Sequence, residues 1–186
     1  IVSIDSFEIS EQKITFLFGE SGIGKTMLSK SIYGLLNPGE LDIKINNTPY
    51  SSYLRDNNTK ELQANSFFVF QEPSSHLNPL LSIGKQLNEG SLAKLEDDSP
   101  ILNHLWQDEQ KENISKILKT FPKPYRPSGG EKQRILLVMF FKKLQLLKQE
   151  ENCFFVLDEP TGNLDNRYRN LALGLIFKFF KTHSFT

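Results

Sequence analysis

The sequence predicts an α/β fold with a largely parallel core sheet and a separate helical lobe. Short apolar segments typical of strands alternate with amphipathic segments typical of helices. A glycine-rich turn joins one of these strands directly to a helix. A polar stretch broken by prolines, from about residue 73 to residue 123, interrupts the alternation and reads as helical pieces.

In the first part of the chain, predicted strands alternate with a predicted helix. Ile14 to Phe18 reads as a short strand, and a helix follows whose apolar positions run from Met27 to Leu36 before "NPG" at 37–39 stops it. Residues 41–45 alternate as a half-buried strand should, and Phe67 to Phe70 reads as a further strand.

The last part of the chain continues the pattern. "EKQRILLVMFFKKLQLL" predicts a long helix, "NCFFVLDEP" a fully apolar buried strand, and the tail from Asn166 another helix. Cys153, the one cysteine, lies in that apolar strand and is expected to be a small buried side chain. The sequence shows no internal repeat.

Composition narrows the class of protein. Lys plus Arg is 22 and Asp plus Glu is 22, so net charge gives no support for a nucleic-acid or anionic-membrane partner. No apolar run approaches the roughly 18 residues that a membrane span needs. With one cysteine and no signal-like start, we expect a reduced, cytoplasmic domain.

The turn "GESGIGKT" at 19–26 matches the phosphate-loop pattern G-x-x-x-x-G-K-[ST], with a predicted strand before it and a helix after it. Its glycines let the backbone bring N–H groups onto phosphates, and the helix adds its positive end. Lys25 is expected to place its charge on the β- and γ-phosphates, and Thr26 to offer its hydroxyl to Mg²⁺. An ordinary glycine-rich turn would not require all four fixed positions.

The predicted strand in "NCFFVLDEP" ends in two adjacent carboxylates, Asp158 and Glu159. Two negative charges at the end of a buried strand need a positive partner. In phosphate-loop enzymes an aspartate at the end of such a strand helps to hold Mg²⁺, which predicts that role for Asp158. Glu159 is then expected to polarise the water that attacks the γ-phosphate.

"SGGEKQR" at 128–134 places a hydroxyl and two glycines directly before the long helix. Taken alone, this stretch is either a second anion-binding helix end or a simple helix cap. A chain that already has a phosphate loop suggests the first reading, with the second end serving a nucleotide on a partner subunit.

These motifs, in this order, resemble the ATPase domain of ABC transporters. The resemblance rests on the phosphate loop at 19–26, Gln71 in "VFQEP", the signature at 128–134, "FFVLDEPT" at 154–161 and "NLD" at 163–165. The longer run "VFQEPSSHLNP" is similar to the importer ATPases for oligopeptides, dipeptides and nickel.

The resemblance implies a P-loop NTPase with a RecA-like core at 1–72 and 135–186 and a helical signature subdomain at 73–134. A small antiparallel β portion is expected around 1–18 and 41–70. It implies ATP and Mg²⁺ as cofactors, a homo- or heterodimer of ATPase subunits, transmembrane permease partners, and a place on the inner face of the cell membrane.

The resemblance also assigns site residues. Glu159 and Gln71 would be catalytic, and Thr26, Gln71 and Asp158 would hold the metal. The nucleotide would be bound by Gly19, Glu20, Ser21, Gly22, Ile23, Gly24, Lys25, Thr26, Met27, Ser128, Gly129, Gly130, Glu131 and Asp165. Ser128 to Gly130 would act on the opposite subunit's γ-phosphate, and Asp165 would cross the dimer interface. Asn78 and Leu80 would border the groove for a permease helix, whereas local packing is the other reading for Leu77, Leu80 and Leu81.

Several positions depart from the family. Only 24 residues precede Lys25, so the strand with the adenine-stacking aromatic is not found, and Phe7 lies too close to serve. His183 lies too near Asp165 to be the switch histidine and is expected at the surface. Pro127 stands where leucine is usual and Met27 where a second hydroxyl is common. We expect a chain truncated at both ends.

Two alternatives remain. One is a non-transport ABC ATPase of the DNA-repair or chromosome-organising kind, but the 57 residues from Gln71 to Ser128 leave no room for its coiled coil. The other is an ABC domain that binds ATP without efficient turnover.

Overall fold

The computed structural model describes residues 5–94, 97, 99–107, 111–122, 127–146, 153–183 and 185–186. The chain divides into two compact units. Unit 1 comprises Ile1–Phe68, Glu150–Asp158 and Ser184–Thr186, and unit 2 comprises Val69–Gln149 and Glu159–His183. Two of the points at which the chain passes between the units are inside strand β3 and between Asp158 and Glu159.

The predicted and observed divisions place the last two helices differently. The contacts group α7 (Gly129–Gln145) and α8 (Asn166–Thr182) with the helical segment. The sequence prediction assigned 135–186 to the nucleotide-binding core. The described residues between 73 and 122 contain no strand. The assignment of 73–134 as a signature subdomain stays a proposal.

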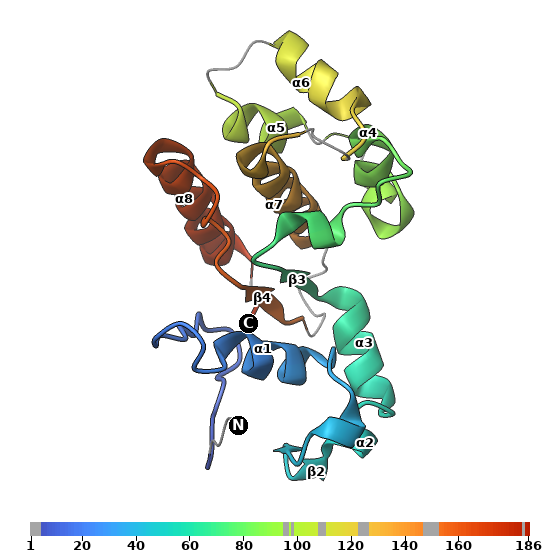
Figure 1. Cartoon of the computed structure of the whole chain (residues 1–186), viewed down its shortest axis with the longest axis vertical. Coiled ribbons are helices and arrows are strands. Elements are labelled where there is room, and N and C mark those ends of the chain that lie inside the picture. The colour runs from blue at the N-terminus through green and yellow to red at the C-terminus, as the bar shows by residue number, and fades with distance from the viewer. Residues whose placement is uncertain are drawn as a thin grey trace. The chain divides into compact units, whose positions relative to one another are not determined.

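Unit 1 contains short helices and two small strand pairs (Figure 1). Its elements in order are α1 (Lys25–Tyr33), η1 (Pro38–Glu40), β1 (Lys44–Ile45), β2 (Thr48–Pro49), α2 (Tyr50–Tyr53), α3 (Asn57–Asn65), β3 (Phe67–Val69) and β4 (Phe155–Leu157). Strands β3 and β4 form a parallel pair, as the predicted fold class requires. They are held by neighbouring contacts: Phe154 N–H donates to Ser66 Oγ at 2.8 Å, and Phe155 packs edge-on against Phe185.

One predicted strand is absent. Residues 14–18 form no strand in this structure, and Phe16 and Phe18 are 61% and 84% exposed. An apolar run becomes a strand only where a neighbour supplies ladder hydrogen bonds, and no strand of the described residues pairs with this one. The prediction of a strand at Ile14 to Phe18 is therefore wrong here.

Two other predicted boundaries also move. Helix α1 ends at Tyr33 because Gly34 (φ +82°) caps it in the left-handed conformation and donates its N–H to Lys30 and Ser31 carbonyls. Leu35 and Leu36, which the prediction included in this helix, thus lie outside α1. The strand predicted at 41–45 is only the two residues of β1, which pairs antiparallel with β2.

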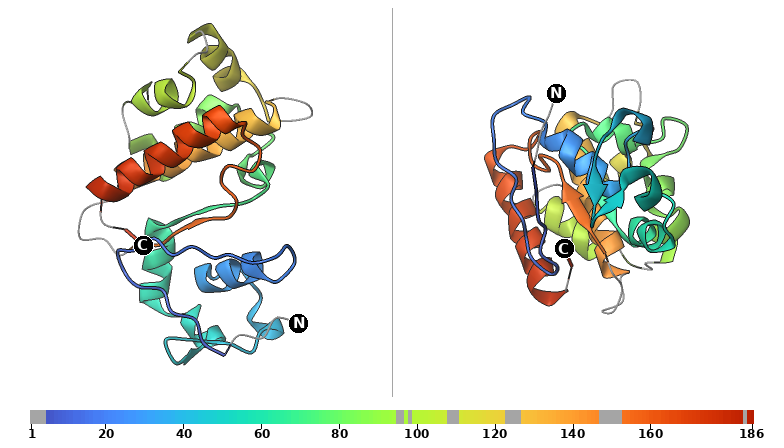
Figure 2. Two further views of the ribbon diagram at one scale, coloured as in Figure 1. Left: turned by 90° about the vertical axis from the view of Figure 1, so that its left-hand side faces the viewer. Right: turned by 90° about the horizontal axis from the view of Figure 1, so that it is seen from below.

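Unit 2 is helical and holds most of the buried apolar side chains of the described residues. Its further elements are η2 (Pro73–His76), α4 (Ile83–Leu87), η3 (Gly90–Lys94), α5 (Ser99–Leu105) and α6 (Lys111–Lys119). Helix α8 runs alongside α7, where Phe141 and Phe179 pack at 5.1 Å (Figure 2).

Two buried cations tie the unit 2 helices together. The Arg134 guanidinium lies between the rings of Trp106 and Tyr168, at 4.4 and 4.2 Å from their centroids, and so links α7 to α8 and to the residue that follows α5. Lys142 is fully buried and donates to the Leu87 carbonyl at 2.6 Å, where α4 ends. Buried charges require such partners because leaving water is costly.

Candidate nucleotide-binding site

The phosphate-loop residues lie in unit 1, in a turn that leads directly into α1. Gly22 (φ +84°) and Gly24 (φ +102°) adopt left-handed backbone, which side chains rarely tolerate, and Gly24 is the N-cap of α1. Around them Gly19, Glu20, Ser21 and Ile23 form the exposed part of the turn. The turn therefore has glycine at two positions where its backbone is left-handed.

Lys25 is the first residue of α1 and reaches back over the turn. Its Nζ donates to the carbonyl oxygens of Gly19 and Glu20, both at 2.7 Å. A lysine ammonium has three N–H donors, so these two bonds hold the charge beside the turn with a third donor still to direct at a ligand. Met27 lies exposed on the same helix and brings no polar group.

Thr26 and Asp158 lie 132 positions apart in the chain and meet in unit 1. Thr26 Oγ1 donates to Asp158 Oδ2 at 2.8 Å. Ligand oxygens on one edge of a Mg²⁺ octahedron, each about 2.0–2.1 Å from the ion, are about 2.9 Å apart. A hydroxyl and a carboxylate oxygen at this separation fit two neighbouring Mg²⁺ ligands.

The second group of predicted residues lies in unit 2. Gln71 Nε2 donates to Glu159 Oε2 at 2.9 Å. Glu159 has φ +49°, an uncommon conformation for a residue with a side chain, and its carbonyl accepts from Gly162 N–H at 3.0 Å. The two adjacent carboxylates thus have separate donors, the Thr26 hydroxyl for Asp158 and the Gln71 amide for Glu159.

The signature residues begin helix α7. Ser128 is its N-cap, and Glu131 completes a capping box: Glu131 N–H donates to Ser128 Oγ at 3.3 Å, and Ser128 N–H donates to Glu131 Oε2 at 2.6 Å. The helix-cap reading of this stretch is therefore realised in the geometry. It leaves the anion-binding role open, since the first-turn N–H groups of Gly129 and Gly130 have no partner inside the helix.

Asp165 performs a similar local task for α8. It is the N-cap, and its Oδ1 accepts from Tyr168 N–H at 3.0 Å. Its predicted role across a dimer interface stays a proposal.

Two residues of this region were not singled out from the sequence. Asn163 lies against the signature, since a Cβ placed on Gly130 would be 3.1 Å from the Asn163 carbonyl oxygen. Asn163 Nδ2 donates to Gln133 Oε1 at 3.4 Å. Gln133 stands in the signature stretch itself, so its amide at a core-facing helix position was a signal that could have been read.

Other candidates divide between surface and interior. Asn78 is exposed and Leu80 is 81% exposed, whereas Leu77 is buried. Local packing therefore explains Leu77 but not Leu80. His183 ends α8 half-buried, stacked on Phe179, which differs from the expected surface position.

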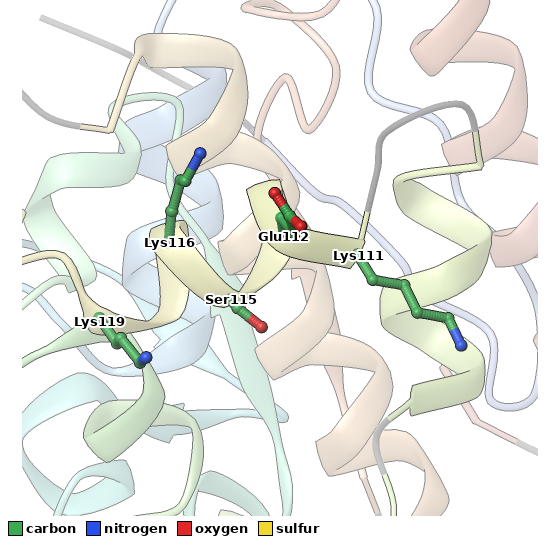
Figure 3. A pocket seen from close by; sticks show the side chains of 5 residues that line it. All are labelled: Lys111, Glu112, Ser115, Lys116 and Lys119. Carbon is green, nitrogen blue, oxygen red and sulfur yellow. The ribbon is translucent and has the colours of Figure 1, made fainter.

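A shallow hollow of about 370 Å³ lies on α6, apart from all predicted site residues. Its lining comes from this helix alone, and the lysine side chains point in different directions (Figure 3). The lining residues are Lys111, Glu112, Ser115, Lys116 and Lys119. Because no other element contributes a group, the hollow does not form a convergent site.

Comparison with known proteins identifies the family. Residues 2–162 match the model of the ABC transporter family. Among the described residues, no helix combines the length and apolar character needed to cross a membrane.

Three relatives illustrate the range of similar proteins. HrtA of Staphylococcus saprophyticus, whose name describes hemin import, is 34% identical over 86% of this chain and 67% of its own length. LolD of Buchnera aphidicola, of a lipoprotein-releasing system, is 29% identical over 92% of this chain and 70% of its own. AppD of Bacillus subtilis, of oligopeptide transport, is 30% identical over 86% of this chain and 48% of its own. The chain therefore belongs to the ABC transporter family, among its ATP-binding subunits.

Proposed function

We propose that this chain binds ATP with Mg²⁺ and hydrolyses it to ADP and phosphate, as a peripheral subunit on the cytoplasmic face of a membrane transporter. The observation that carries the proposal is the 2.8 Å hydrogen bond from Thr26 to Asp158. It brings the end of the phosphate loop to the end of a buried strand, where phosphate-loop enzymes hold their metal.

The chain's own groups provide the nucleotide site in this proposal. Gly22 and Gly24 give the loop the left-handed backbone with which its N–H groups would bind phosphate, and Lys25 supplies the positive charge from the first turn of α1. Thr26 and Asp158 would hold Mg²⁺, which when bound neutralises charge on the phosphate oxygens.

Glu159 is proposed to orient the attacking water. The Gln71 amide holds one of its oxygens at 2.9 Å, which fixes the carboxylate and leaves the other oxygen to accept a proton. This gives Gln71 a role in placing Glu159, beside the metal contact that the resemblance implies.

The signature is proposed to act on a nucleotide bound by a second ATPase subunit. Ser128 Oγ accepts a hydrogen bond within the cap, and its hydroxyl proton remains to donate to a phosphate. Gly129 and Gly130 add unpaired first-turn N–H groups and the positive end of a 17-residue helix. Asp165 would contact the partner subunit nearby.

The transported substrate is proposed to be a peptide, with nickel as a further possibility raised by the run "VFQEPSSHLNP". The relatives of oligopeptide and dipeptide transport support the peptide class, although the hemin and lipoprotein relatives show how far cargo varies in this group. The exposed Asn78 and Leu80 are proposed to meet a permease subunit.

Replacement of Lys25 by alanine tests nucleotide binding. The loss of a charge-assisted contact worth roughly 1.5–3 kcal/mol should weaken Mg-ATP binding about ten- to a hundred-fold in calorimetry. Lys30→Ala, which removes the same charge from the same helix, is the matched control and should leave the affinity unchanged. Equal affinities for wild type and Lys25→Ala would refute the assignment.

Replacement of Glu159 by glutamine tests hydrolysis in the full-length protein. The variant keeps its shape and one acceptor but loses the negative charge, so ATP should bind, turnover should cease, and size-exclusion chromatography with ATP should show a persistent dimer. Adding Ser128→Arg should abolish that dimer. Ser128→Ala, which loses the hydroxyl but adds neither bulk nor charge, should weaken the dimer less than Ser128→Arg does. Hydrolysis at the wild-type rate in Glu159→Gln would refute this role for Glu159.

A further inference from the structure

Gln133 is an anomaly within unit 2. Its side chain is fully buried (0% exposed), yet its Nε2 has no hydrogen-bond partner among the described residues. A buried amide donor without a partner destabilises a fold, and an apolar side chain of the same size would avoid the cost. The amide of Gln133 at this position therefore indicates a role other than packing.

The other end of the same amide points to that use. Gln133 Oε1 accepts from Asn163 Nδ2 at 3.4 Å, a long hydrogen bond. Asn163 belongs to the turn that ends at the α8 cap, and Gln133 lies in the second turn of α7, within the signature stretch 128–134. The pair therefore joins two segments that are 30 positions apart.

The signature glycines also lie close to Asn163, and so join the same two segments. A Cβ on Gly129 would lie 3.9 Å from the Asn163 side chain, and one on Gly130 would lie 3.1 Å from its carbonyl oxygen. Gly130 has a helical conformation, so the need for glycine there comes from this neighbour and not from the backbone. Asn163 thus contacts the signature through its side chain and its main chain.

The chemistry of the pair is complementary. Two primary amides can exchange two hydrogen bonds, and here one is formed while the Gln133 Nε2 donor and the Asn163 Oδ1 acceptor remain to form a second. A small movement of the turn could close the second bond. The pair can therefore hold the turn against the signature through one bond or two.

We propose that Gln133 is a positioning residue that holds Asn163 against Gly129 and Gly130, so that the signature and the turn ending at Asp165 move as one body. The functional consequence of this inference rests on the proposed function. Both segments would contact the nucleotide bound by the partner subunit at the same time. Gln133 itself is buried and does not touch the nucleotide.

Gln133→Met tests the inference in the full-length protein, since methionine matches glutamine in size but lacks the amide. The melting temperature should be retained, because the unpartnered donor is removed. The kcat for ATP should fall about tenfold, while Mg-ATP affinity stays within twofold of wild type. Asn163→Ala should cause a similar fall, and the double variant should lose no more than either single variant.

Gln86→Met is the matched control. Gln86 is also a buried glutamine of unit 2, but its amide is fully used: Nε2 donates to Asn78 and Leu81 carbonyls at 2.9 Å, and Oε1 accepts from Asn78 N–H at 2.8 Å. Its replacement should lower the melting temperature and leave the exchange of amides 163–165 unchanged. Gln133→Met should show the opposite pattern, with about tenfold faster exchange at 163–165 in nucleotide-free protein.

The exchange measurement separates this inference from the proposed function, since it needs no ATP. Unchanged exchange at 163–165 in Gln133→Met would overturn the inference even if ATP turnover fell. Multiplicative losses in the double variant would also overturn it. Undiminished ATP affinity in Lys25→Ala would instead overturn the proposed function, and the exchange result would still decide the role of Gln133.

Discussion

The two units of this protein are stabilised differently. Unit 2 packs helices around a core of large apolar side chains, including Trp106, Phe140 and Phe141. Unit 1 buries few such side chains among its described residues and exposes several before and within α1. The described buried apolar residues of unit 1 are Tyr50, Phe68, Cys153, Phe155, Val156 and Phe185.

Unit 1 relies instead on single polar contacts between segments. Thr26 donates to Asp158, Tyr53 donates to the Ile32 carbonyl at 2.8 Å, and Gln63 donates to the Tyr33 carbonyl at 2.8 Å. A bond between neutral groups contributes roughly 1 kcal/mol and one to a charged acceptor such as Asp158 about 1.5–3 kcal/mol, whereas truncating a buried phenylalanine costs about 3–5 kcal/mol. The comparison teaches that the phosphate loop lies in the less strongly packed unit, while the signature lies on the packed one.

The largest effect should come from truncating the unit 2 core. Phe140 is fully buried, so Phe140→Ala should lower the free energy of unfolding by about 3–5 kcal/mol. Phe18→Ala removes the same atoms from an exposed position in unit 1 and should change it by no more than about 0.5 kcal/mol. Circular dichroism, which reports both units, follows urea unfolding of the two variants, and fluorescence of Trp106, the one tryptophan, reports unit 2. Equal midpoints for the two variants would contradict the comparison.

This contrast also explains how much of the fold could be predicted from the sequence. Local signals located the start of α1 at the glycine turn and the start of α8 at Asn166, and they placed the start of α7 at Glu131, two residues after its observed first residue, Gly129. Each signal acts within a few residues, so it can be read without knowing the neighbours.

The errors arose where a distant partner decides the outcome or where a local signal was overlooked. The strand at 14–18 needed a paired neighbour, which its own residues cannot specify. Gly34 and the Asn46–Asn47 turn, with φ of +50° and +61°, were readable signals for the end of α1 and for a hairpin.

The candidate site shows the same division. The phosphate loop and the two carboxylates could be predicted because their chemistry fixes both residue type and spacing. The bonds from Gln71 to Glu159 and from Asn163 to Gln133 join residues 88 and 30 positions apart, which no local pattern reveals.

A smaller effect is expected from the polar contact that anchors the phosphate loop. Thr26→Val keeps the branched shape but removes the donor to Asp158, a charged acceptor, so unit 1 should lose about 1.5–3 kcal/mol. Hydrogen exchange of α1 amides should accelerate, while the Trp106 unfolding midpoint stays unchanged. Thr26→Ser keeps the hydroxyl and should behave as wild type. A shift of the Trp106 midpoint in Thr26→Val would show that the units are not separately stabilised.

The smallest effect should be seen in alkali, where the described tyrosines with a raised pKa belong to unit 1. Burial raises the pKa of Tyr33 to about 12, and it also raises the pKa of Tyr50 and Tyr53. The unfolded chain loses the Tyr33 proton near pH 10 and the folded chain near pH 12, so the folded state binds more protons between these values. The stability that Tyr33 contributes is therefore complete below pH 10 and is lost as pH rises through 12.

Tyr33→Phe should remove this part of the alkaline dependence, because phenylalanine keeps the edge-on contact with Phe68 but cannot ionise. The difference in tyrosinate absorbance between wild type and variant isolates the titration of Tyr33 in the folded protein. Its midpoint should lie well above 10, provided that unit 1 remains folded, which circular dichroism at each pH checks. A midpoint near 10 in folded protein would mean that Tyr33 is hydrated, and that unit 1 is packed still less tightly around α1 than its buried tyrosines indicate.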